Sequence, residues 1–151
     1  NTVCFRGGCL TGPSHSGAKL HGFLSYLVKC CLKNKIYTIY GYKGKQVRDN
    51  IHSEDLVNMI WEFIKKPSKG EVYNVGGGLK NSCSILEAIK LIEIMTKKKI
   101  RIKISKKNRK GDHIWYVTNL KKFKKKYPKW KINYSLKQII SEIIIKQNLI
   151  N

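Results

Sequence analysis

The chain has 151 residues, of which 42% are hydrophobic, so it is long enough and apolar enough for one modest globular domain. Its formal net charge is +22, but only four of its 31 basic residues are arginine, and we interpret this charge as a lysine-rich solvated surface without a specific nucleic-acid partner. No apolar run approaches the roughly 18–20 residues of a membrane span, which argues against a membrane protein.

The first half of the chain predicts alternating strands and helices. An apolar run predicts a strand over Thr2–Arg6, and a glycine-rich loop follows over Gly7–Gly17. Apolar residues at helical spacing predict a helix over Lys19–Lys33. Two more strands and a helix, with acidic residues in its first turn, are then expected over Ile36–Tyr40, Val47–Ile51 and Ser53–Lys65.

The second half continues the alternation. A strand is expected over Glu71–Val75, and two capping boxes, Ser84 with Glu87 and Ser135 with Gln138, predict the starts of two helices. Between them we expect a strand over Ile100–Ile104, an extended Asp112–Val117 segment and a short lysine-rich helix capped by Asn119. The fold class is therefore α/β, with too few strands for a complete doubly wound sheet.

The five cysteines are odd in number and contain no Cys-x-x-Cys pair. This pattern favours reduced thiols in a cytoplasmic protein over a disulfide framework. The four histidines show no ligand spacing, so no metal site is expected.

Arg48 and Arg109 are prominent because arginine is scarce in this chain. A guanidinium group binds a phosphate through two parallel hydrogen bonds, whereas an ammonium group cannot. On residue type alone, these two arginines either clamp a diphosphate from two loops or form structural salt bridges.

Five segments resemble, in order and spacing, the extended short-chain dehydrogenase/reductases of the NAD-dependent epimerase/dehydratase family: Phe5–Pro13, Gly44–Leu56, Tyr73–Ser84, Arg109–Asp112 and Tyr127–Trp130. The first three are most similar to the CDP-paratose (CDP-tyvelose) 2-epimerases. The resemblance implies that residues 1–151 are the substrate-binding C-terminal portion, with the last strands of a Rossmann-type, incomplete doubly wound sheet. The N-terminal NAD-binding portion is expected upstream.

The same resemblance implies roles for individual residues. Arg48 and Arg109 would hold the diphosphate of a nucleotide sugar, and Tyr40 would lie beside the base, unless it is an ordinary strand aromatic. His21 falls where the family contacts substrate, although a surface histidine is the alternative.

The loop after the first strand carries further implied contacts. Gly7 and Gly8 would pass close to the nicotinamide of NAD, where missing side chains permit a close approach. Cys9 falls where related epimerases often carry an asparagine that contacts substrate, which puts a polar role for this position in doubt. His52 and Asp55 are expected to orient the Arg48 loop, and Asp112 to position Arg109.

Two catalytic signatures of the family are missing from the sequence. The glycine-rich NAD turn has no counterpart, because Gly76–Gly78 comes too late and leads into a different loop. The only Tyr-x-x-x-Lys match, Tyr127–Lys131, contains Pro128 and is interpreted as chance. We therefore predict no catalytic residue in this chain.

The predicted function is the nucleotide-sugar-binding half of an NAD-dependent epimerase, with a CDP-sugar favoured over a UDP- or other nucleotide sugar. A separate NAD-binding half or a second copy of the chain is a possible partner. The alternatives are a non-catalytic nucleotide-binding remnant and a basic nucleic-acid-binding domain, and salt dependence would distinguish these.

Overall fold

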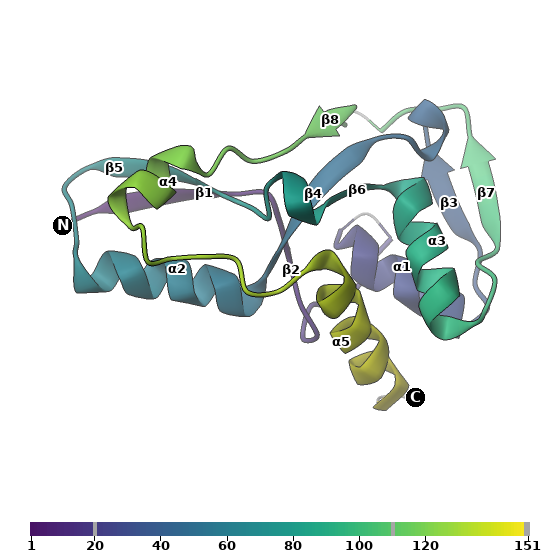
Figure 1. Ribbon diagram of the computed structural model, residues 1–151. Helices are drawn as coiled ribbons and strands as arrows, with labels where there is room; N and C mark the ends of the chain where they lie inside the picture. The colour runs from purple at the N-terminus through teal and green to yellow at the C-terminus, as the bar shows by residue number, and fades with distance from the viewer. Residues whose placement is uncertain (20, 110, 150–151) are drawn as a thin grey trace.

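The computed structural model describes residues 1–19, 21–109 and 111–149. Figure 1 shows an elongated molecule with the N-terminus at one end and the C-terminal helix near the other. The strands are β1 (Val3–Gly7), β2 (Cys9–Thr11), β3 (Tyr37–Tyr40), β4 (Val47–His52), β5 (Glu71–Val75), β6 (Ser82–Ser84), β7 (Ile102–Ser105) and β8 (Trp115–Tyr116). The α-helices are α1 (Phe23–Leu32), α2 (Ser53–Lys65), α3 (Ile85–Thr96), α4 (Lys121–Lys126) and α5 (Leu136–Leu149), and short 3-10 turns occupy Tyr42–Gly44 and Leu79–Asn81.

At the N-terminal end, β1 and β5 form a parallel pair, with Phe5 opposite Tyr73. Parallel strands need a crossover connection, and α2 lies in the one that joins these two. The core here is aromatic: the Tyr73 and Phe123 rings meet edge to face at 5.1 Å, and Phe123 meets Trp130 at 5.3 Å. These ring contacts hold β5, α4 and the segment after α4 together at this end of the molecule, where the parallel strand pair resembles part of a Rossmann sheet.

At the other end, α1, α3 and α5 surround a second core with the parallel pair β3–β7. Leu27, Val28, Ile92, Ile139 and Ile143 are among its fully buried side chains. The helical spacing of apolar residues in the sequence predicts that these positions are buried, and this is confirmed. The same spacing predicts a buried Leu86 on α3, but this side chain is 40% exposed.

The two ends meet along β4. This strand pairs in parallel with β2 and β8 and antiparallel with β6. The structure is therefore α/β with an incomplete, mostly parallel sheet system, as predicted. Because β4 starts at one core and ends at the other, residues on it are placed at the seam between the two ends (Figure 1).

Two element predictions were wrong in their bounds. The Gly7–Gly17 segment contains β2, which exists because it pairs with β4 and not because of its local composition. The first helix starts at Phe23 instead of Lys19, since Gly22 adopts a left-handed conformation with φ 69°. Leu20, which we expected on that helix, lies outside the described residues.

Both predicted capping boxes are confirmed. Ser84 Oγ accepts a hydrogen bond from the Glu87 amide at 3.1 Å, and the Glu87 carboxylate accepts one from the Ser84 amide at 2.7 Å. Ser135 and Gln138 make the corresponding pair of bonds at 2.9 and 3.3 Å. Local pairs of this kind satisfy amides that the first turn of a helix leaves open.

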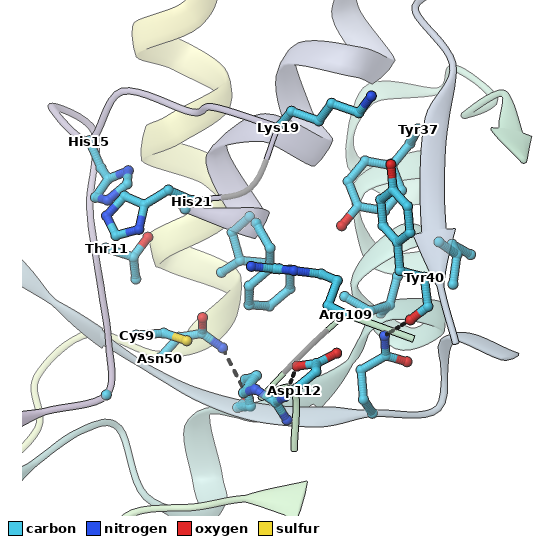
Figure 2. Close-up of a pocket in the computed structure, with 18 of the residues that line it drawn as sticks. Cys9, Thr11, His15, Lys19, His21, Tyr37, Tyr40, Asn50, Arg109 and Asp112 are labelled. Carbon is cyan, nitrogen blue, oxygen red and sulfur yellow. Dashed lines mark hydrogen bonds and ion pairs between the residues drawn. The ribbon is translucent and has the colours of Figure 1, made fainter. Parts of the chain in front are cut away.

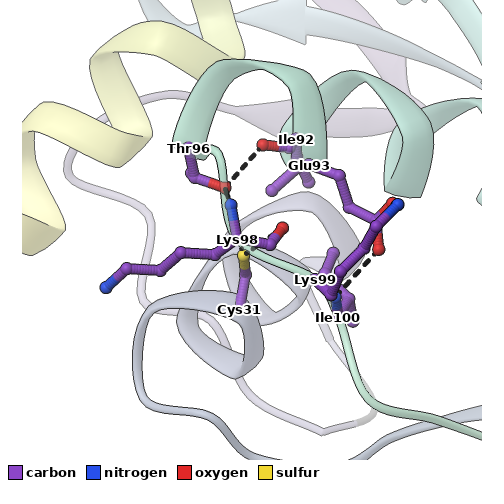
Figure 3. A network of polar contacts seen from close by, with 7 residues as sticks. All are labelled: Cys31, Ile92, Glu93, Thr96, Lys98, Lys99 and Ile100. Carbon is purple, nitrogen blue, oxygen red and sulfur yellow. Dashed lines mark hydrogen bonds and ion pairs between the residues drawn. The ribbon is translucent and has the colours of Figure 1, made fainter.

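Figure 3 shows how the end of α3 turns toward β7. Thr96 Oγ1 donates to the Ile92 carbonyl at 2.8 Å and lies 3.3 Å from Cys31 Sγ, while Glu93 accepts from the Ile100 amide at 2.9 Å. These contacts give Cys31 a structural role between α1 and α3. All five cysteines are free thiols, as expected.

One face of α2 remains apolar and exposed. Val57, Ile60, Trp61 and Ile64 recur at helical spacing, and their exposed fractions range from 37% to 58%. Within the described part of the chain, β1 pairs on one side only, with β5. An exposed apolar helix face and a strand edge without a neighbour are each typical of a surface that another segment covers. Among the helices described, none is both long and apolar enough to span a bilayer.

Candidate functional site

A pocket of about 500 Å³ opens at the seam between the two ends, a volume suited to a small-molecule ligand. Its walls come from β2, the N-terminal turn of α1, β3 and the middle of β4, together with Arg109 and Asp112. Figure 2 shows the labelled residues spread across it, from His15, His21, Thr11 and Cys9 at one end, past Arg109 and Asp112, to Tyr37 and Tyr40 at the other. The pocket therefore has two ends joined by a basic centre.

Arg48 is held firmly in the pocket wall. Its guanidinium group donates to the Val47 carbonyl at 2.6 Å and to the His113 carbonyl at 2.5 Å, and it forms an ion pair with Asp112. Both side chains of that ion pair are about 15% exposed or less. The carboxylate of Asp112, which we expected to position Arg109, thus binds the guanidinium of Arg48.

Arg109 also lines this pocket and lies at its centre in Figure 2. Burial raises the pKa of the Tyr37 phenol, and the positive charge of Arg109 acts against that rise. Arg109 therefore lies close enough to the buried phenol to act on it electrostatically. The structure brings the two predicted arginines to one cavity.

Tyr40 lies at the end of β3, which pairs with β7 alone among the described strands. It is half-buried and lines the pocket, as an aromatic that stacks on a flat ligand would. Gln46 Nε2 donates to the Tyr40 carbonyl at 3.2 Å, and the glutamine itself is buried. Sequence reasoning missed Gln46, because a single glutamine in a turn carries no signal of its own.

The opposite end of the pocket is less charged. Thr11 and His15 line it with the predicted residues His21 and Cys9. The His15 and His21 rings lie 5.5 Å apart, and an added side chain on Gly22 would overlap the His15 ring. Burial raises the pKa of the Cys9 thiol to about 11, so it stays neutral and donates weakly at neutral pH.

The glycines near the pocket differ in how closely the chain packs over them. Gly8 lines the pocket, whereas Gly7 packs on Leu10 beside it. Any side chain on Gly76 would overlap Thr118 and Asp49, and one on Gly77 would overlap the Asn50 carbonyl. The space over these two glycines is filled by the chain itself, so this run is not open to a ligand. The approach of Gly7 and Gly8 to a nicotinamide stays a prediction.

Asp49 holds the glycine segment and Thr118 close to β4. It is fully buried next to Arg48, and its Oδ2 accepts from the Gly78 amide at 2.8 Å and from the Thr118 amide at 3.1 Å. This carboxylate ties the glycine loop and the segment after β8 to the strand that carries Arg48. The glycine run therefore supports the pocket wall from behind.

His52 and Asp55 are structural, but they do not orient the Arg48 loop as we expected. His52 caps α2 by accepting from the Glu54 amide at 3.1 Å, stacks on Tyr134 and lies 3.0 Å from Glu142. The Asp55 carboxylate accepts from the Asn133 amide at 3.0 Å and the Tyr134 amide at 3.2 Å. Both residues fasten the segment before α5.

Tyr127 has no place in the pocket. It is buried among aromatic rings and its hydroxyl group donates to the Lys66 carbonyl at 2.9 Å. Residues 127–131 follow α4 in an irregular segment, so Tyr127 and Lys131 do not share a helix face. The interpretation of this match as chance is confirmed.

In the described part of the chain, no cluster of three or more His, Cys, Asp or Glu residues could hold a metal ion.

Residues 1–76 match a family model described as the NAD dependent epimerase/dehydratase family. A CDP-paratose 2-epimerase from Salmonella typhi is 35% identical over 100 residues, which are 62% of this chain and 29% of that protein. The dTDP-glucose 4,6-dehydratase 1 of Escherichia coli K12 is 35% identical over 66 residues, covering 44% of this chain and 17% of the relative.

Solved structures resemble nearly the whole chain. A UDP-glucuronic acid 4-epimerase from Bacillus cereus, in complex with UDP-glucuronic acid and NAD, gives a TM-score of 0.84 at 23% identity and covers 99% of this chain. A dTDP-glucose 4,6-dehydratase from Bacillus anthracis, in complex with NAD, gives 0.81 at 26% identity and covers 97%. This chain covers only 46% and 44% of those two proteins.

Proposed function

Because this chain belongs to the NAD dependent epimerase/dehydratase family, we propose that it supplies the nucleotide-sugar pocket of such an enzyme. The observation that carries this proposal is the convergence of Arg48 and Arg109 on one pocket with an aromatic residue, Tyr40, at its end. Arginine is suited to a diphosphate and a tyrosine ring to a base, and both are present at one cavity.

The ligand would lie along the pocket in a fixed direction. The base would stack on Tyr40, the diphosphate would lie at Arg109 and Arg48, and the sugar would reach the end formed by Cys9 and His21 (Figure 2). The ion pair between Arg48 and Asp112 leaves the wall pre-organised, which lowers the entropy cost of binding.

A CDP-sugar is the substrate we favour. The resemblance of residues 5–13, 44–56 and 73–84 to CDP-paratose 2-epimerases supports it, as does the 35% identity to the Salmonella typhi enzyme. Similar solved structures hold UDP-glucuronic acid, so UDP-sugars are the comparison that any binding experiment requires.

The residues of this chain do not account for catalysis by themselves. A redox epimerisation needs NAD and a proton-transferring residue, and neither the glycine-rich NAD turn nor a helical Tyr-x-x-x-Lys pair occurs in the sequence. We propose that a second portion supplies them and packs on the open edge of β1 and the apolar face of α2. The free thiols are consistent with a reducing cytoplasm.

The proposal is tested by calorimetric titration of the purified chain with CDP and with UDP at about 0.15 M salt, where surface charges are screened beyond roughly 8 Å. We expect saturable one-to-one binding, tighter for CDP, that persists when the salt concentration is tripled. A folded chain that binds neither nucleotide would refute the pocket assignment. Binding that collapses with salt and is exceeded by a single-stranded oligonucleotide would favour the nucleic-acid alternative instead.

A further inference from the structure

The turn that connects β3 to β4 has a strained backbone. All four residues from 41 to 44 have a positive φ, and two of them, Tyr42 and Lys43, are not glycine. Gly41, with φ 65° and ψ 178°, lies in a region that essentially only glycine occupies. Strain of this kind persists where the surrounding structure imposes it, and it is concentrated at functional sites. The turn starts directly after Tyr40, which lines the pocket.

The segment after β7, which carries Arg109, packs on this turn. The Gly41 amide donates to the Ser105 carbonyl at 3.2 Å, so the turn continues the pairing of β3 with β7. Asn108 then lies over Gly41: a Cβ atom at Gly41 would be 1.9 Å from Asn108 Oδ1 and 3.2 Å from Asn108 Cα. The residue that precedes Arg109 therefore rests where only a glycine leaves room for it.

A side chain at position 41 would move the backbone beside Arg109. Rotation of the Asn108 side chain cannot relieve the overlap completely, because the Asn108 Cα atom is also too close. Arg109 belongs to an exposed segment, yet its side chain lies at the centre of the pocket (Figure 2). A long side chain loses more conformational freedom on binding when its backbone is not already fixed, and the contact with Gly41 supplies that restraint.

The same turn also fixes the Tyr40 end of the pocket. The Gly44 amide closes the turn by donating to the Gly41 carbonyl at 3.3 Å, and Gln46 Nε2 donates to the Tyr40 carbonyl at 3.2 Å. Tyr40 and Arg109 are far apart in the sequence, but both are held against this one turn. Its geometry therefore sets the spacing between the aromatic ring and the guanidinium group.

We infer that Gly41 is a positioning residue for nucleotide binding: it seats Asn108 and thereby fixes Arg109 relative to Tyr40, a role that rests on the proposed function. Gly41 does not itself line the pocket, so it acts through Arg109 and not by touching the ligand.

The test measures the affinity for CDP by calorimetry in the wild type, in Gly41→Ala, in Arg109→Ala and in the double variant. We expect Gly41→Ala to weaken CDP binding about tenfold, the factor that corresponds to the loss of one charge-assisted hydrogen bond. Because Gly41 acts through Arg109, the double variant should bind CDP no more weakly than Arg109→Ala alone. A general disturbance of the fold would instead multiply the two losses.

Gly70→Ala is the control, because it also places an alanine at a positive φ, 63°, where a Cβ atom would meet nothing within 4 Å. Gly70 is exposed and lies outside the pocket, so this variant should keep the wild-type affinity for CDP.

Asn108→Ala is the second variant, since it removes the side chain that rests on Gly41 and leaves the turn unchanged. It should weaken CDP binding about threefold, again with no further loss when combined with Arg109→Ala. Asn108→Ala decides alone if Gly41→Ala is shown by circular dichroism not to fold.

Two results would overturn the positioning role while the nucleotide pocket stands: wild-type affinity for CDP in the folded variants, or a double variant that shows both losses multiplied. If the wild type fails to bind CDP, the proposed function itself falls, and this inference falls with it.

Discussion

Replacing Asp55 with alanine is expected to lower the free energy of unfolding by about 3–4 kcal/mol. The carboxylate is fully buried and accepts three hydrogen bonds, from the Asn133 amide, the Asn133 side chain and the Tyr134 amide, at 3.0–3.2 Å. Its removal leaves these donors without the buried acceptor that holds the segment before α5. Urea unfolding followed by tryptophan fluorescence measures the loss.

Glu54→Ala is the matched control, because Glu54 is a carboxylate in the same helical turn but is exposed. It should cost less than about 1 kcal/mol, the usual size of a helix-dipole contribution at the surface. Equal losses in the two variants would show that Asp55 acts through the helix start and does not fasten the segment before α5.

Replacing Arg109 with alanine is expected to weaken CDP binding by about 100-fold. Charge-assisted hydrogen bonds contribute roughly 1.5–3 kcal/mol each, and two parallel bonds to a phosphate correspond to at least that factor. Arg48→Ala would also remove the hydrogen bonds to the Val47 and His113 carbonyls and the ion pair with Asp112, so the substitution is made at Arg109. Calorimetry at fixed salt gives the affinities.

Arg101→Ala removes the same charge from an exposed position outside the pocket, so its effect should stay within about twofold. Lysine at position 109 should restore only part of the affinity, because an ammonium group cannot donate two parallel bonds. If the losses at positions 101 and 109 are alike, general charge attraction and not a pocket contact accounts for binding.

Much of the fold could be predicted because its signals are local. The Ser84–Glu87 and Ser135–Gln138 boxes fix helix starts within four residues of sequence, and the apolar spacing of α1 and α5 predicted buried positions such as Val28 and Ile139. Neither feature depends on contacts with residues that are distant in the sequence.

The features that were missed depend on tertiary contacts. Strand β2 forms only because β4 lies beside it, and Asp55 finds its partners 78 and 79 residues later in the chain. The same holds for the pocket. Arg48 and Arg109 could be singled out by residue type, whereas Thr11, His15 and Gln46 are recognised only because the folded chain places them in the pocket wall.

A nitrogen-15 NMR titration of the chain with CDP locates the bound nucleotide on the structure. We expect saturable shifts of backbone amides in β2, at Tyr40 and at Arg48, with the lysine-rich helix α4 unaffected. Shifts concentrated along α4, or shifts that grow without saturation and vanish with added salt, would contradict this expectation and leave the pocket without a nucleotide.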